Sequence, residues 1–130
     1  LAGKAPKNSK VAILGLTFKE NCPDTRNSKV EDIINRLAEY DINPIIVDSW
    51  ANKEEAKNEY NVELSPIQNV KNVDCVILAV AHDEFKNLTW KDIDEMYNQE
   101  TLIENRVLID VKGIRNKKEA DKIGYKYWRL

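Results

Sequence analysis

Three cations stand shortly after apolar runs of strand length, where a cleft for an anion could form. Lys19 and Arg26 lie in the polar stretch that follows residues 10–16, and Lys112 follows residues 107–111. A bound diphosphate requires cations and backbone amides that converge on one cleft. Composition alone favours solvated loop charges for these side chains, so a phosphate site is the second interpretation at this point.

The residue types needed for covalent catalysis or for a zinc site are scarce. The chain contains two cysteines and one histidine. Cys75 stands inside an apolar run, which predicts a buried core thiol. His82 follows the same run and has no evident nucleophile partner in the sequence, so we expect a structural role for it. Without paired cysteines, a zinc site is not expected.

The turn after the first apolar run lacks the glycine fingerprint of a dinucleotide-binding fold. That fingerprint, Gly-x-Gly-x-x-Gly, lets the backbone approach a pyrophosphate. Here the turn begins with Gly15 and continues Leu-Thr-Phe-Lys. Asp48 ends the second predicted strand, where an NAD-binding unit keeps its ribose carboxylate, but a strand-end turn or a helix cap explains Asp48 equally well. We therefore do not expect this chain to bind NAD by itself.

Strand-length apolar runs alternate along the chain with segments of helical period. The predicted strands are residues 10–16, 44–47, 62–64, 73–81, 107–111 and 125–130. The predicted helices are residues 28–41, which opens with a capping box, and residues 52–60, 65–70, 89–98 and 116–123, the last ended by Gly124. This alternation predicts an α/β fold: a Rossmann-like, doubly wound, mostly parallel sheet with helices on both faces. Ligands of such sheets lie beyond the carboxyl ends of the strands.

Length, composition and charge limit the number of domains and the kinds of partner. The chain has 130 residues, 42% of them hydrophobic and 32% charged, with a formal net charge of −2. These values fit one globular domain without the basic excess that attracts nucleic acid or an anionic membrane, so neither is an expected partner. We expect residues 1–9 to be a linker stub and residues 10–130 to form the domain. The two distant cysteines suit a reducing, cytoplasmic setting.

Residues 15–28, called the signature segment below, resemble the opening of the C-terminal, UDP-binding domain of the UDP-glucose/GDP-mannose dehydrogenase family. The family pattern is Gly-x-x-Phe-Lys, then Asp-x-Arg, then Ser or Thr entering a helix, and the segment reads Gly-Leu-Thr-Phe-Lys-Glu-Asn-Cys-Pro-Asp-Thr-Arg-Asn-Ser. The resemblance continues through residues 74–85 and 109–113. With His-Asp-Glu-Phe at 82–85 and Tyr-Trp-Arg-Leu at 127–130, the chain is most similar to members that act on UDP-N-acetylhexosamines.

The resemblance implies roles for individual residues. Phe18 and Lys19 match family residues that close over the UDP-sugar, with Lys19 pairing with the charge of the nucleotide. Lys112 lies at or beside a position where several members have an arginine that contacts the UDP-sugar, although lysine lacks the bidentate fork of arginine. Arg26 matches an arginine that reaches toward NAD. Cys22 does not match the catalytic cysteine of the family, which belongs to a preceding part of the chain.

The resemblance therefore predicts the nucleotide-sugar-binding domain of an NAD-dependent enzyme that oxidises C6 of the sugar to a uronic acid. It implies that NAD is bound mainly by a separate N-terminal domain, that a central region makes the whole protein a homo-oligomer, and that this chain alone is inactive. One alternative is a free-standing regulatory or nucleotide-sensing α/β module, but a receiver-like module needs an acidic cluster where this chain has Leu-Thr-Phe-Lys. Another is a self-sufficient small enzyme, for which no nucleophile elbow or phosphate loop is evident.

Overall fold

The computed structural model describes residues 9–17, 21–23 and 29–129. Its centre is a five-stranded sheet in the order β2-β1-β3-β4-β5, in which every neighbouring pair is parallel. The strands are β1 (Val11–Leu14), β2 (Ile45–Val47), β3 (Cys75–Leu78), β4 (Val107–Asp110) and β5 (Lys126–Arg129). The predicted Rossmann-like α/β sheet is confirmed, and β5 is an edge strand.

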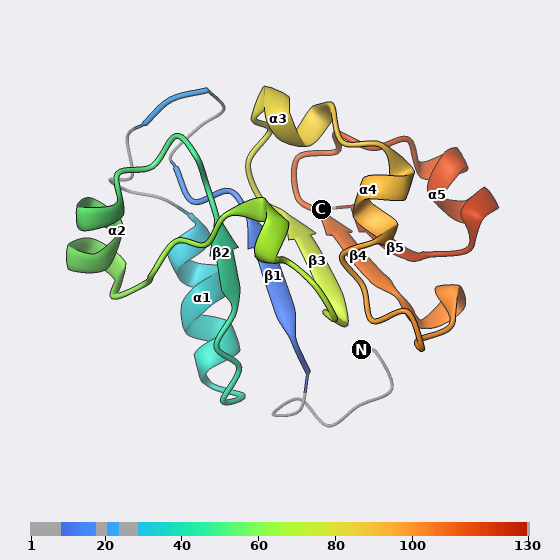
Figure 1. Ribbon diagram of the computed structural model, residues 1–130, viewed down its shortest axis with the longest axis horizontal. Helices are drawn as coiled ribbons and strands as arrows, with labels where there is room; N and C mark the ends of the chain where they lie inside the picture. Colours follow the sequence, from blue (N-terminus) through green and yellow to red (C-terminus); the bar gives the residue numbers. More distant parts are fainter. Residues whose placement is uncertain (1–8, 18–20, 24–28, 130) are drawn as a thin grey trace.

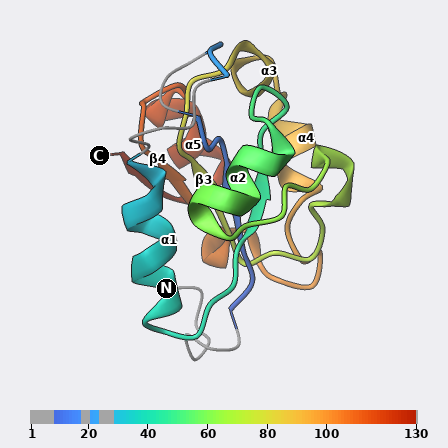
Figure 2. The ribbon, with the colours of Figure 1, turned by 90° about the vertical axis from the view of Figure 1, so that its left-hand side faces the viewer.

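Helices cover both faces of this sheet (Figure 1). The first face packs against α1 (Val30–Ala38), with α2 (Lys53–Tyr60) beside it. The second face packs against η2 (Ile67–Asn69), α3 (Asp83–Lys86), α4 (Trp90–Asp94) and α5 (Lys117–Ile123), and η3 (Ile103–Asn105) precedes β4. Figure 2 shows α1 and α4 on opposite sides of the sheet. The helices are short, and no described helix combines the length and the apolar character needed to cross a bilayer.

Alternation along the strands produces two apolar layers. In β1, Val11 and Ile13 face the α1 side, whereas Ala12 and Leu14 face the α4 side, and all four are buried. Strands buried on both faces read as continuous apolar runs, which is why the sequence predicted them readily.

The strand order contains one switch point, between β1 and β3. From β1 the chain moves outward to β2, then returns to the other side of β1 and continues through β3, β4 and β5. The loops that leave the carboxyl ends of β1 and β3 therefore diverge, and in open α/β sheets a ligand crevice forms at this place.

Among the predicted elements that are shorter than expected, two have a clear structural cause. Residues 62–64 do not form a strand but a single bridge between Leu64 and Ile46, and Pro66, which has no N–H, follows soon after it. The helix predicted at 89–98 begins as expected after the capping box of Thr89 but ends at Asp94. It stops there because Tyr97 leaves the helix to bridge to Val73, and its hydroxyl donates to the Val107 carbonyl.

The helix boundaries in the structure differ in detail from those predicted from the sequence. Lys29 stands at the cap position of α1 and its side chain makes no capping bond, whereas Ser28 of the predicted capping box lies outside the described residues. Gly124 ends α5 with a φ of 109°, as predicted. The sequence did not predict α3, whose four residues are too few to show a helical period.

Candidate functional site

The loops after β1, β3 and β4 meet at the carboxyl edge of the sheet around a cavity of about 270 Å³, the carboxyl-edge cavity. Its lining consists of Thr17, Lys29, Val30, Ile33, Ala79, Val80, Val111 and Lys112. Two lysines, Lys29 and Lys112, thus line one cavity at the switch point of the sheet. The amino terminus of α1, which carries partial positive charge, begins there at Val30. Glu31 and Asp32 of the same turn are exposed and stand outside the described lining.

A glycine lets the end of β1 approach the end of β3 below this cavity. Gly15 has a φ of 113°, and a Cβ added to it would lie 2.6 Å from the Cβ of Val80 and 2.8 Å from its backbone nitrogen. A side chain here would meet the backbone of Val80, which cannot move aside as a flexible side chain would. The first glycine of the signature segment is therefore required for both its conformation and its contact.

Asp48, directly after β2, is a buried carboxylate that fixes the start of the signature segment. Its Oδ2 accepts hydrogen bonds from the backbone N–H of Leu16, at 2.7 Å, and of Thr17, at 2.9 Å. The same oxygen lies 3.0 Å from Nε2 of His82. Burial acts to raise the pKa of Asp48, but the hydrogen bonds from His82, Leu16 and Thr17 outweigh it and lower the pKa below its ordinary value. The carboxylate is therefore charged and joins β1, β2 and β3 at their carboxyl ends.

The arrangement around Asp48 does not fit an NAD site. Its second oxygen, Oδ1, accepts from the backbone N–H of Trp50 at 2.9 Å and of Ala51 at 3.3 Å. Both oxygens are thus engaged by protein donors, in agreement with a strand-end turn rather than a ribose ligand. The turn after β1 also contains the single glycine Gly15 in place of the three-glycine fingerprint. The described residues therefore do not form a dinucleotide site.

The described histidine and cysteine side chains are absent from the lining of the carboxyl-edge cavity. His82 is fully buried and does not line the carboxyl-edge cavity, which agrees with the structural role expected for it. Cys75 is a buried free thiol, and burial raises its pKa to about 12. Cys22 is a half-buried free thiol. Within residues 9–17, 21–23 and 29–129, no cluster of three histidine, cysteine or acidic side chains could hold a metal ion.

The loop that presents Lys112 is fixed by the buried carboxylate of Asp110. Its Oδ1 accepts from the backbone N–H of Ile114 at 3.0 Å. Its Oδ2 accepts from the backbone N–H of Arg115 at 2.8 Å and from the hydroxyl of Tyr127 at 2.5 Å. The turn after β4 is therefore held from both β4 and β5, which sets the place of Lys112 beside the cavity.

Among the residues predicted to bind the UDP-sugar, Lys112 lies at the carboxyl-edge cavity. Phe18 and Lys19, and the predicted NAD contact Arg26, lie outside the described residues. The sequence did not single out Lys29, which borders the same cavity. Its position directly before α1, immediately after the signature segment, is the signal that could have identified it.

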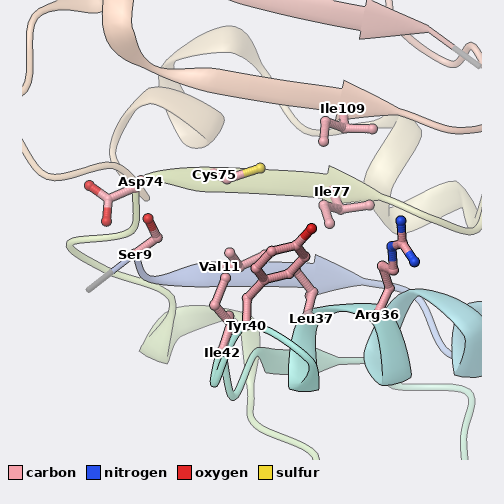
Figure 3. Close-up of a pocket in the computed structure, with 10 residues that line it drawn as sticks. All are labelled: Ser9, Val11, Arg36, Leu37, Tyr40, Ile42, Asp74, Cys75, Ile77 and Ile109. Carbon is pink, nitrogen blue, oxygen red and sulfur yellow. The ribbon is translucent and has the colours of Figure 1, made fainter. Parts of the chain in front are cut away.

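A second cavity, the apolar groove, has a volume of about 430 Å³ and lies on the α1 face of the sheet (Figure 3). Its lining consists of Ser9, Val11, Arg36, Leu37, Tyr40, Ile42, Asp74, Cys75, Ile77 and Ile109. Most of these side chains are apolar, and the one described cation, Arg36, shares the lining with the carboxylate of Asp74. The groove thus lacks the convergent cations of a diphosphate site, although it is the larger cavity.

The comparisons with known proteins agree with the resemblance in the sequence. The family model of the UDP-glucose/GDP-mannose dehydrogenase family, UDP binding domain, matches residues 12–117. The chain is 41% identical over 113 residues to a UDP-N-acetyl-D-glucosamine 6-dehydrogenase of Pseudomonas aeruginosa, a match that covers 87% of this chain and 26% of the relative. It is 33% identical over 118 residues to a UDP-N-acetyl-D-mannosamine dehydrogenase of Methanococcus vannielii, covering 90% of this chain and 26% of the relative.

A solved structure supports the fold. The NDP-N-acetyl-D-galactosaminuronic acid dehydrogenase of Methanosarcina mazei Go1 superposes with a TM-score of 0.82 at 23% identity, over 98% of this chain and 26% of that one. The chain therefore spans about a quarter of the length of the relatives it matches. With a family model matched over most of its length, the chain belongs to the UDP-glucose/GDP-mannose dehydrogenase family and corresponds to its UDP binding domain.

Proposed function

We propose that this chain binds the UDP part of a UDP-sugar in the carboxyl-edge cavity. The observation that carries the proposal is the pairing of Lys29 and Lys112 at one cavity, at the switch point of the sheet and beside Thr17 of the signature segment. A diphosphate carries charge on closely spaced oxygens, and two ammonium groups with a helix amino terminus supply the complementary field.

The signature segment would complete this site. Lys19 is proposed to pair with the phosphates and Phe18 to close over the UDP-sugar. Thr17, at the cavity, directly precedes these two residues in the chain. On this account the cavity is one part of the site, formed by Thr17, the loops after β3 and β4 and the start of α1, and Phe18 and Lys19 are proposed to complete it.

The reaction is proposed for a longer protein of which this chain is one domain. In that protein, C6 of a UDP-sugar is oxidised from an alcohol to a carboxylate with two NAD reduced, and the names of the relatives favour a UDP-N-acetylhexosamine. NAD would be held mainly by another domain, since the described residues of this chain do not fit it, and Arg26 is proposed to contact that NAD. We further propose that the longer protein is a homo-oligomer through its central region, and that it works in the cytoplasm, where two free cysteines remain reduced.

Replacing Lys112 with alanine is expected to weaken UDP binding about three- to tenfold, because one exposed cation beside the diphosphate is lost. Titration calorimetry of UDP into the two proteins measures the change. The matched control is Lys71→Ala, which removes the same charge from an exposed position before β3, at the amino edge of the sheet. Equal weakening by both substitutions would mean that the effect reflects net charge, and an unchanged affinity for Lys112→Ala would remove Lys112 from the site.

The chain alone is expected to show no dehydrogenase activity. Its described residues do not fit an NAD site, and its described thiols and imidazole do not line the carboxyl-edge cavity. The measurement is NADH formation, followed by absorbance, from UDP-N-acetylglucosamine and NAD. Activity above that of a heat-denatured sample would contradict the assignment of catalysis to another part of a longer protein.

A further inference from the structure

The imidazole of His82 lies between the two flanks of the segment proposed to bind the nucleotide. On one flank, Nε2 is 3.0 Å from Oγ1 of Thr17 and 3.0 Å from Oδ2 of Asp48. On the other flank, Nδ1 accepts a hydrogen bond of 2.8 Å from the backbone N–H of Asn21. One buried ring therefore contacts both residues that bracket Phe18, Lys19 and Glu20 in the chain.

These contacts define the tautomer of the ring. Because Nδ1 accepts from the Asn21 amide, it carries no proton, and the ring proton is on Nε2. There it faces two oxygens, the carboxylate of Asp48 and the hydroxyl of Thr17. Asp48 thus keeps the ring proton on Nε2, which leaves the lone pair of Nδ1 free to accept from the backbone N–H of Asn21.

The two flanks depend on His82 to different degrees. Thr17 keeps a second tether without the imidazole, since its N–H is bound to Asp48. Asn21 has a φ of 52°, an unusual conformation for a residue other than glycine, and its backbone N–H bonds to His82. Its side chain adds one bond, from the N–H of Asp83 to Oδ1 at 3.1 Å. The distinct contribution of His82 is therefore to hold the backbone at Asn21.

The ring itself is held firmly enough to act as such a support. Its side chain is fully buried, with Trp50 stacked at a centroid distance of 6.1 Å and an interplanar angle of 25°. The ring of Phe85 packs on it at 5.6 Å. Trp50 follows β2, whereas His82 and Phe85 follow β3, so the support connects two loops of the carboxyl edge.

We propose that His82 is a positioning residue for UDP binding: through Nδ1 it holds the backbone of Asn21, which lies two residues after Lys19 in the chain, in one conformation before the nucleotide arrives. This inference rests on the proposed function. Fixing a binding segment in advance lowers the entropy lost on association and thereby raises affinity. His82 touches no ligand in this account and acts through the segment alone.

Two conservative variants separate this role from general packing. His82→Asn places an amide oxygen where Nδ1 stands and can still accept from Asn21, but it cannot reach Asp48. His82→Gln places its terminal amide near the position of Nε2 and keeps a donor toward Asp48, but it offers Asn21 no acceptor at the position of Nδ1. Calorimetric titration of UDP is expected to show a dissociation constant about tenfold higher for His82→Gln, and one within about threefold of the wild type for His82→Asn.

The outcomes distinguish this inference from the proposed function. If the wild-type chain binds no UDP, the proposed function fails and the inference fails with it. If the wild type binds and His82→Gln binds equally well, or if His82→Asn is weakened as much as His82→Gln, the positioning role alone is overturned. A nitrogen NMR spectrum of the imidazole gives a check that needs neither a variant nor UDP: an unprotonated Nδ1 is expected, and a protonated Nδ1 would contradict the inference.

Discussion

Replacing Asp48 with alanine is expected to destabilise the chain by about 3–5 kcal/mol. The substitution leaves the backbone N–H groups of Leu16 and Thr17 without their buried acceptor, and it removes the oxygen beside Nε2 of His82. Because a buried donor without a partner loses its full solvation, this loss exceeds that of an ordinary surface hydrogen bond. Urea denaturation followed by circular dichroism measures the change in the free energy of unfolding.

The control for this prediction is Asp121→Ala. Asp121 is exposed and pairs with Lys117 across one turn of α5, so its removal is expected to cost less than about 0.5 kcal/mol. Comparable losses for the two substitutions would show that the buried carboxylate of Asp48 does not join the carboxyl ends of β1, β2 and β3.

The stability that Asp48 contributes should also depend on pH in a defined direction. Its pKa in the folded chain lies below the ordinary value, so the unfolded chain binds the proton more readily. The contribution is therefore complete above the unfolded pKa of about 4 and is lost as the pH falls through the lower folded pKa. Below pH 4 the free energy of unfolding of the wild type should fall more steeply than that of Asp48→Asn, and parallel curves would contradict this assignment.

The substitution Gly15→Ala is expected to cost about 3 kcal/mol. The new Cβ would lie 2.8 Å from the backbone nitrogen of Val80, and the φ of 113° is itself strained for any residue with a side chain. Gly113→Ala is the matched control: its φ is also positive, at 68°, but the added Cβ would approach only the flexible side chain of Arg129, at 3.4 Å. That variant is expected to lose about 1 kcal/mol.

Thermal and urea unfolding of both glycine variants test this difference. A loss for Gly15→Ala no greater than that for Gly113→Ala would mean that the contact with Val80 does not constrain the turn. A difference of about 2 kcal/mol would support the close approach of the ends of β1 and β3 at the base of the carboxyl-edge cavity.

Much of the fold was predictable because its strands are buried on both faces and its helices carry local signals. The runs that became β1 and β3 are apolar throughout, and β4 is apolar up to Asp110. Thr89 and Gly124 mark helix ends by side-chain and backbone chemistry that acts within a few residues. The failures came where distant contacts decide the structure. The helix after Thr89 stops early because Tyr97 bonds to Val107 of β4 and pairs as a bridge with Val73 in the loop before β3.

The site was predictable to a smaller extent. Lys112 could be named because it lies in a motif, whereas the importance of Lys29 depends on where α1 begins relative to the loop after β4. The bond between Asp48 and His82 joins residues 34 positions apart, and the local sequence around each gives no sign of the other. The sequence therefore allowed both a ribose ligand and a strand-end turn for Asp48, and the geometry decided between them.

The most direct test of the account is the map of amide chemical-shift changes when UDP is added to the isotopically labelled chain. Binding at the carboxyl-edge cavity predicts the largest changes at the amides of Thr17, Val30, Val80 and Lys112, with those of Leu37, Cys75 and Ile77 in the apolar groove nearly unchanged. The same changes should not be produced by NAD at equal concentration. Shifts centred on the apolar groove, equal shifts with NAD, or no shifts at millimolar UDP would contradict the claim that this domain binds UDP beyond the carboxyl ends of its strands.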